Sequence, residues 1–294
     1  GQNIKEGMAE RMIKHLPEST VRRLGIFSHG EETVHIHRDE PVFDGQYSNS
    51  CYQEAVKTAF GDFQRQAVDD GRWNPKTDEP LTEQWSRIIV HLPYAFQAKR
   101  MFPDVFRHDR RGGPVWDEII SEIGEEPLRD DFEDTPEGES SYEKSANGYR
   151  RAISKTTSYQ KFHLRRIEKG QRASSLIGNQ YTGSIFLALM STFESDYEEN
   201  SSLEGDTFGL CGYGSGAKAK VFEGTVSESW REVVSGWNLF ERLAGRMAID
   251  ELTYTELHKG TLHKSVVKPS GEFALIDVET EGVLEGARSY SWIN

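Results

Sequence analysis

Three short runs of apolar residues have the pattern of β-strands. Residues 88–91 are apolar up to His91 and are soon followed by Pro93, which cannot continue a central strand. Residues 207–213 and 219–226 are extended-type segments on either side of a turn that contains Gly214 and Gly216. We therefore predict three strands, of which the last two form a hairpin.

Apolar residues at helical spacing predict helices between and around these strands. The helix at 49–69 carries Ala55, Phe60 and Phe63 on one side, and the helix at 180–193 is apolar enough to be buried. Further helices are predicted at 94–106, at 149–168 and, as one or two amphipathic helices, at 227–257; residues 264–294 form a mixed tail. Strands and helices along one chain indicate an α/β fold.

The pattern divides the chain of 294 residues into three parts. Residues 1–32 have helical spacing as far as Pro17, residues 33–235 hold the predicted strands, and residues 236–294 form a helical extension and tail. An acidic insertion lies at about 109–145. Between Asp117 and Glu143 there are twelve acidic residues and one basic residue, Arg129, so this segment accounts for most of the net charge of −13. Its prolines, glycine and serines predict a solvated, partly disordered segment.

Composition excludes several classes of function. No apolar run approaches the roughly 20 residues that a membrane-spanning helix needs, so a membrane partner is not expected. The first residues do not resemble a secretory signal, and the two cysteines, Cys51 and Cys211, are too few for a disulfide framework, which favours the cytoplasm. An acidic surface of this kind is a poor partner for nucleic acid. Basic pairs such as Lys99 and Arg100 suit a polyphosphorylated ligand only if they converge on one cleft.

Candidate site residues each allow a structural and a functional interpretation. The turn Tyr213-Gly214-Ser215-Gly216 could present backbone N–H groups to an oxyanion, or could be a plain β-turn. His91 stands at the carboxyl end of a strand, where open α/β sheets bind ligands, but it could also be a structural histidine. Asn179 could cap the following helix or donate its amide into a site.

A metal site is not predicted. His35 and His37 lie on the same face of the short strand predicted at 33–37, so two ligands are conceivable there. Because no third ligand follows them, we expect neither a metal nor another bound cofactor.

Three sequence blocks in this order resemble hydroxymethylglutaryl-CoA synthase, a member of the thiolase-like superfamily. They are His91-Leu-Pro-Tyr94, Gly178-Asn-Gln-Tyr-Thr-Gly-Ser184 and Gly212-Tyr-Gly-Ser-Gly216. A further segment, 41–52, is similar to the family's Val-Asp-Gly-x-x-Ser-x-x-Cys-Tyr pattern. The resemblance runs from about His35 to Trp237, and the insertion and tail are most similar to the longer bacterial members.

The resemblance implies an activity, a fold and an assembly. The family condenses acetyl-CoA with acetoacetyl-CoA to give hydroxymethylglutaryl-CoA and CoA, a step of the mevalonate pathway. By motif, His91 and Asn179 resemble the residues that hold the acetoacetyl group, and the backbone N–H of Ser215 resembles part of the oxyanion hole. Tyr181, Tyr213 and Gly214 would line the pocket. The implied architecture is the second half of the five-layered thiolase-like fold, usually in a homodimer.

Departures from the family pattern limit what this chain can do. The family's nucleophilic cysteine and catalytic glutamate precede the Val-Asp-Gly segment by a long distance, so we expect them outside this chain and expect the isolated chain to be inactive. Neither Cys51 nor Cys211 falls at the nucleophile's position. Phe96 replaces a lysine that contacts CoA, a role that Lys99 or Arg100 could take.

These departures leave three interpretations open. The chain resembles the carboxyl half of a synthase whose other half is supplied in trans or in a longer protein, with exposed apolar surface where that half packs. Alternatively, it belongs to a synthase that performs β-branching on a polyketide carried by an acyl carrier protein. In the third interpretation it is a non-catalytic half that only binds acyl-CoA.

Overall fold

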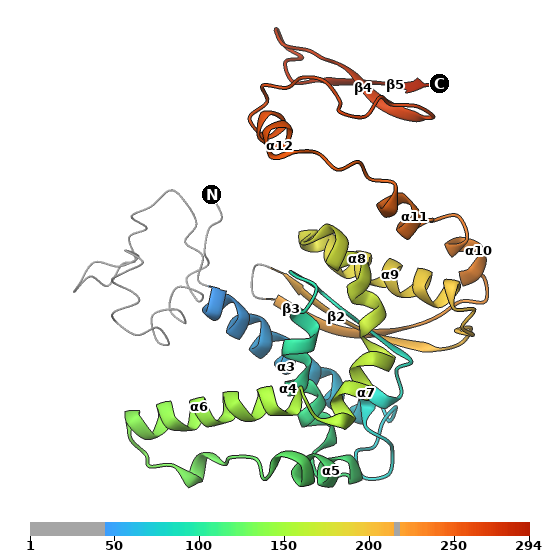
Figure 1. Ribbon diagram of the computed structural model, residues 1–294. Coiled ribbons are helices and arrows are strands. Elements are labelled where there is room, and N and C mark those ends of the chain that lie inside the picture. Colours follow the sequence, from blue (N-terminus) through green and yellow to red (C-terminus); the bar gives the residue numbers. More distant parts are fainter. Residues whose placement is uncertain (1–44, 215–217) are drawn as a thin grey trace. The chain divides into compact units, whose positions relative to one another are not determined.

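The computed structural model describes residues 45–214 and 218–294 and divides the chain into two compact units (Figure 1). The first unit ends at Phe240 and the second is Glu241–Asn294. The predictions for residues 1–32, for the strand at 33–37 with His35 and His37, and for Ser215 lie outside the described residues.

A three-stranded mixed sheet lies at the centre of the first unit. Its strands are β1 (Arg87–Val90), β2 (Thr207–Gly214) and β3 (Lys218–Thr225), in the order β1-β2-β3. β1 pairs with β2 in parallel, with Val90 opposite Cys211, and β2 pairs with β3 in antiparallel. All three strands were predicted within about one residue of these bounds. The parallel pair needs a long crossover, which the intervening helices provide.

Two helices cover opposite faces of this sheet. Phe208 of β2 stacks on Phe193 of α9 (Ser184–Glu198), with 5.1 Å between the ring centroids. Tyr213, five residues further along the same strand, points to the other face. There it meets Tyr52 of α3 (Gly45–Asp69) at 4.5 Å. The predicted helices at 49–69 and 180–193 are therefore the two layers that enclose the sheet, and α8 (Glu168–Ile177) packs on α9.

The crossover from β1 to β2 contains most of the remaining helices. They are α4 (Gln97–Arg110), α5 (Pro114–Ile123), η2 (Arg129–Asp131), α6 (Pro136–Ile153), α7 (Thr157–Arg166) and η3 (Tyr181–Gly183). The short helix η1 (Leu81–Glu83) precedes β1. α4 and α7 share an aromatic core of Phe102, Phe106, Tyr159 and Phe162. The guanidinium of Arg110 is fully buried over the rings of Phe106 and Phe162 and pairs with Glu83 at 2.5 Å.

The acidic segment is more regular than its composition predicts. α5 and α6 occupy much of it, and the hydroxyl of Thr135 caps α6 by accepting a hydrogen bond from the N–H of Gly138 at 3.0 Å. Arg129, the basic residue of the segment, pairs with Glu139 at 2.7 Å. The prediction of partial disorder was wrong because capping and these ion pairs offset the repulsion, although most of its acidic side chains are exposed as expected.

The carboxyl-terminal part is mixed. α10 (Trp230–Val234) belongs to the first unit, and α11 (Leu239–Ala244) crosses the boundary between the units. The second unit holds α12 (Glu251–His258) and an antiparallel hairpin of β4 (Glu272–Val278) and β5 (Arg288–Ile293). The structure has three short helices where one or two amphipathic helices were predicted at 227–257, and the hairpin was not predicted.

Candidate functional site

His91 follows β1 directly and is held at both of its backbone groups. Its N–H donates to the carbonyl of Cys211 in β2 at 3.0 Å, and its carbonyl accepts a hydrogen bond from the hydroxyl of Tyr52 in α3 at 2.7 Å. The residue is 7% exposed. Burial lowers the pKa of His91, so the imidazole is neutral at neutral pH. A neutral imidazole can donate from one nitrogen and accept at the other, which suits contact with a polar substrate group.

Aromatic rings surround this histidine. The Tyr52 ring lies 6.3 Å from the imidazole at an interplanar angle of 28°, and the Tyr213 ring lies 6.2 Å from it. Burial raises the pKa of Tyr213, with a further contribution from nearby Cys51. Burial likewise raises the pKa of Tyr52 well above its usual value, so both phenols keep their protons, and the Tyr52 hydroxyl donates to the His91 carbonyl.

Asn179 organises the turn between α8 and α9. Gly178 ends α8 in the left-handed region, with φ 89°, and Tyr181 has φ 49°. The Asn179 side-chain oxygen accepts hydrogen bonds from the Tyr181 N–H at 2.7 Å and from the Ser184 hydroxyl at 3.2 Å. The turn therefore uses the oxygen of this exposed amide, and its NH₂ group is the part with donors for a ligand. Asn179 is not the cap of α9, whose N-cap is Gly183.

Parts of the first two sequence blocks contact β2, which carries the third, near its carboxyl end. The His91 N–H bonds to Cys211, the neighbour of Gly212, because β1 and β2 run in parallel. η3 packs against β2, and a Cβ built on Gly212 would lie 3.7 Å from the Cδ1 atom of Ile185. Gly214 is the last residue of β2 and pairs with Lys218. Ser215 lies outside the described residues.

The remaining predicted site residues are exposed. Tyr181 has 74% of its surface exposed, and Phe96 before α4 has 64%. Lys99 and Arg100 are exposed in the first turn of α4, where the Arg100 guanidinium lies 5.8 Å from the centroid of Tyr94. Their position, a few residues beyond His91, places positive charge on the same segment as the histidine.

Cys211 does not have the surroundings of a nucleophile. Cys211 is fully buried in β2, and burial raises the pKa of its thiol to about 12. Cys51 is half-buried on α3. A thiol with the pKa of Cys211 stays protonated at neutral pH and is a poor nucleophile.

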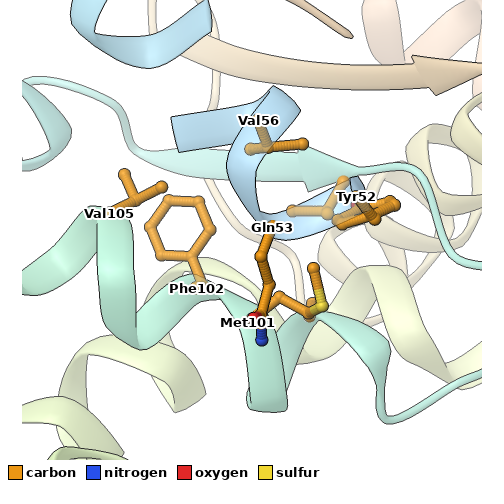
Figure 2. Close-up of a pocket in the computed structure, with 8 residues that line it drawn as sticks. Tyr52, Gln53, Val56, Met101, Phe102 and Val105 are labelled. Carbon is orange, nitrogen blue, oxygen red and sulfur yellow. The ribbon is translucent and has the colours of Figure 1, made fainter. Parts of the chain in front are cut away.

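A small cavity lies between α3, β1 and α4, close to Tyr52 (Figure 2). Its volume is about 10 Å³, and its lining includes Val56, Met101 and Phe102. That is room for about one water molecule, so it is a packing gap and not a binding pocket for a thioester.

Two further properties concern only the part of the chain that the structure describes. In 45–214 and 218–294, no group of three or more His, Cys, Asp or Glu residues could hold a metal ion. Over the same ranges, none of the helices has the length and apolar character needed to cross a membrane.

Tyr52, which contacts His91, was not among the predicted site residues. In the sequence it appeared only as the neighbour of Cys51 in a matched pattern. The available signal was its place on the apolar side of the helix at 49–69, but the hydrogen-bond partner is 39 residues away and only the fold brings the two together.

Comparisons with known proteins identify the family of the chain. The family model for the carboxyl-terminal part of hydroxymethylglutaryl-coenzyme A synthase matches residues 35–279. Hydroxymethylglutaryl-CoA synthase of Haloferax volcanii is 28% identical over 239 residues, which is 79% of this chain and 51% of the relative. The Saccharomyces cerevisiae synthase is 22% identical over 237 residues, covering 79% and 45%. The chain thus spans about half the length of the curated relatives it matches.

Solved structures show the same fold. MvaS in complex with 3-hydroxy-3-methylglutaryl coenzyme A aligns with a TM-score of 0.61 and 25% identity, over 88% of this chain and 54% of that one. The HMG synthase of the curacin biosynthetic pathway, in complex with holo donor-ACP, aligns at 0.56 and 16%, over 90% and 55%. At that identity the second comparison concerns the fold alone. With the family model matching most of its length, the chain belongs to the hydroxymethylglutaryl-CoA synthase family, as a carboxyl-terminal portion with a thiolase-like fold.

Proposed function

We propose that this chain is the acetoacetyl-binding part of a hydroxymethylglutaryl-CoA synthase, which condenses acetyl-CoA and acetoacetyl-CoA and releases hydroxymethylglutaryl-CoA and CoA. The observation that carries the proposal is that His91 and η3, which follows Asn179, both contact β2 near its carboxyl end. β1 and β2 run in parallel, so their carboxyl ends lie at the same edge of the sheet. Because the chain belongs to the hydroxymethylglutaryl-CoA synthase family, we interpret this edge as the acetoacetyl site.

Each residue has a role that fits its surroundings. The neutral imidazole of His91 and the NH₂ group of Asn179 would hydrogen-bond the acetoacetyl group, and Tyr181, Tyr213 and Gly214 would line its pocket. The backbone N–H of Ser215 would donate to the thioester oxyanion. Fixed donors in a site that excludes water stabilise such an anion better than water does, because they need no reorganisation as charge develops. Lys99 and Arg100 would bind the phosphates of CoA. They would take the role of the family's CoA-contacting lysine, whose position is occupied in this chain by the uncharged Phe96.

The chemistry also needs groups from outside this chain. An acetylated cysteine would lose a methyl proton to a glutamate, and the carbanion would attack the ketone carbon of acetoacetyl-CoA. Water then cleaves the enzyme thioester and frees the product. The buried Cys211 thiol cannot supply that nucleophile, so the isolated chain is expected to give no condensation.

The nucleophilic cysteine and the catalytic glutamate would be supplied by the other half of the fold. Phe186, in the first turn of α9, has 63% of its surface exposed, and Tyr181 just before it is also exposed. An apolar surface of this kind is expected where a further layer packs. That layer would come from the same longer protein or from a separate chain in trans, and a homodimer is the expected assembly. The product would then enter the cytoplasmic mevalonate pathway.

Intact mass after incubation with acetyl-CoA tests this proposal, followed by a product assay with acetoacetyl-CoA. Both are run on this chain and on the complete reading frame that contains it. An acetyl adduct and hydroxymethylglutaryl-CoA from the longer protein alone would support the proposal. An adduct on this chain at Cys51 or Cys211 would contradict it.

The same assay with an acetylated acyl carrier protein in place of acetyl-CoA separates the alternative functions. Turnover with the carrier protein alone would identify a β-branching synthase. Retained CoA binding without any turnover would identify a non-catalytic acyl-CoA-binding half.

A further inference from the structure

The carbonyl of His91 accepts its hydrogen bond from a helix and not from a strand of the sheet. β1 ends at Val90, and the N–H of His91 makes the last hydrogen bond to β2. The carbonyl of His91 points instead to α3, where the Tyr52 hydroxyl donates to it at 2.7 Å. A buried carbonyl without a partner costs free energy comparable to a lost hydrogen bond, so this contact decides whether the backbone can stay in place.

Tyr52 also packs on the His91 side chain. Its ring lies beside the imidazole, with 6.3 Å between the centroids and 28° between the planes, and it meets Tyr213 at 4.5 Å on the same side of the sheet. Only 2% of Tyr52 is exposed, and it projects from α3 beside Val56 (Figure 2). One rigid side chain therefore limits both the backbone and the ring orientation of His91.

We propose that Tyr52 is a positioning residue for His91. Its hydroxyl anchors the His91 carbonyl and its ring sets the plane of the imidazole that faces the second substrate. This inference rests on the proposed function, because it assumes that His91 binds the acetoacetyl group. It concerns the condensation step alone, since acetylation by acetyl-CoA takes place on groups outside this chain.

Removal of the hydroxyl has a specific expected effect. In Tyr52→Phe the ring stays, but the His91 carbonyl loses its donor and the backbone after β1 can shift. A displacement of about 1 Å at a catalytic group can cost on the order of 10²-fold in rate. We expect kcat/KM for acetoacetyl-CoA to fall about 10- to 100-fold while acetylation by acetyl-CoA is retained.

A matched control separates positioning from stability. Tyr149 is also buried, at 7% exposed, and its hydroxyl donates to a backbone carbonyl, that of Gly124, at 3.1 Å. It belongs to α6 and packs on Trp116 of α5. Tyr149→Phe therefore removes the same kind of hydrogen bond at a place that does not touch His91, and its kinetics should stay within about twofold of the wild type.

The experiment uses the complete protein that contains this chain, with wild type, Tyr52→Phe and Tyr149→Phe. Three quantities are measured: the acetyl adduct by mass, kcat/KM for acetoacetyl-CoA, and the NMR resonances of the His91 imidazole, assigned by their loss in His91→Gln. The proposal expects a shifted His91 resonance and a selective kinetic loss in Tyr52→Phe alone. Kinetics are compared below the thermal midpoint of every variant, so that only folded protein is assayed.

The outcomes distinguish this inference from the proposed function. Equal kinetics and an unchanged His91 resonance in Tyr52→Phe would overturn the positioning role, even if the variant lost stability. A wild-type protein without synthase activity would overturn the proposed function. In that case the NMR comparison alone still decides whether Tyr52 sets the environment of His91.

Discussion

Arg87 of β1 and Asp196 of α9 form a two-pronged ion pair inside the first unit. The guanidinium donates from Nε to Oδ2 at 2.8 Å and from Nη2 to Oδ1 at 2.6 Å. The Asp196 carboxylate has no exposed surface, and Lys169 also donates to it at 2.6 Å. Burial acts to raise the pKa of Asp196, but the hydrogen bonds from Arg87, Lys169 and Ser201 outweigh it and lower that pKa. The pair fixes the carboxyl-terminal half of α9 to the strand that leads to His91.

Asp196→Asn should destabilise the first unit by about 3 kcal/mol, because it leaves the mostly buried guanidinium of Arg87 without its counter-charge, whereas Lys169 keeps its pair with Glu199. The loss is measured as the difference between the free energies of unfolding of the wild type and the variant, each obtained by urea titration. Glu198→Gln is the matched control on the same helix, since the pair of Glu198 with Arg172 is about half exposed. That control should lose less than about 1 kcal/mol. Equal losses in the two variants would show that burial does not strengthen the Asp196 pair.

Gly209→Ala should prevent the normal packing of β2. A Cβ at this position would lie 2.1 Å from Cε3 of Trp85, whose indole is fully buried and donates to Glu223 at 2.8 Å. Overpacking of this kind costs about 1–3 kcal/mol or more. Gly224→Ala, in the neighbouring strand, meets no atom within 4 Å. Thermal midpoints should fall for Gly209→Ala and stay the same or rise for Gly224→Ala, and a Gly209→Ala protein as stable as wild type would contradict the packing argument.

The strands and enclosing helices could be predicted because local signals agree. The strand at 88–91 is bounded by Pro93, the hairpin by its glycines, and α3 by its apolar side. The acidic segment shows the opposite case. Its composition is typical of disorder, but Arg129 and the cap at Thr135 allow a helix that a count of charges does not predict.

Individual residues of the candidate site were proposed from the sequence, but the hydrogen bonds that hold them in place were not. His91 and Asn179 were found from motifs, whereas the hydrogen bond from Tyr52 to the His91 carbonyl depends on how α3 lies on the sheet. The role of Asn179 in its own turn was also missed, because it depends on the positive φ of Tyr181. The hairpin of β4 and β5 was not predicted because β4 has a continuous apolar run, 273–276, with no regular alternation, and the alternation of β5 is confined to 289–292.

His163 should make stability depend on pH in the acid range. Burial, followed by the charge of Lys99, lowers the pKa of His163 to about 4, although a hydrogen bond with Gln171 opposes the shift. In the unfolded chain a histidine has a pKa near 6.5, so between these values the unfolded state binds the extra proton. The contribution of His163 is complete above about pH 6.5 and is lost as pH falls to about 4, by about 3 kcal/mol in total.

Comparison with His163→Gln isolates this contribution, since His91 and His108 also have lowered pKa values and titrate in both proteins. The free energy of unfolding is measured by urea titration from pH about 7 to about 4. The wild type should lose more stability than the variant over that range. Parallel curves would mean that His163 is protonated in the folded protein as easily as in the unfolded one.

His91→Ala and Asn179→Ala, made in the complete protein, should each lower the rate of condensation. Deletion of a preorganised donor at an active site costs about 10²–10³-fold, because the developing charge loses a partner that water does not replace. Acetylation by acetyl-CoA should persist in both variants, since neither residue is assigned to that step. The measurements are the acetyl adduct by mass and the rate of formation of hydroxymethylglutaryl-CoA in the presence of acetoacetyl-CoA.

Gln160→Ala, an exposed amide on α7 that bonds to the carbonyl of Lys155, serves as the control for loss of an amide and should keep the wild-type rate. A selective loss of condensation in His91→Ala and Asn179→Ala would place the second substrate at the carboxyl end of β1 and β2. Near-normal turnover in His91→Ala would contradict the assignment of this edge as the acetoacetyl site, because the buried, neutral imidazole would then be a structural group held by Tyr52 and β2.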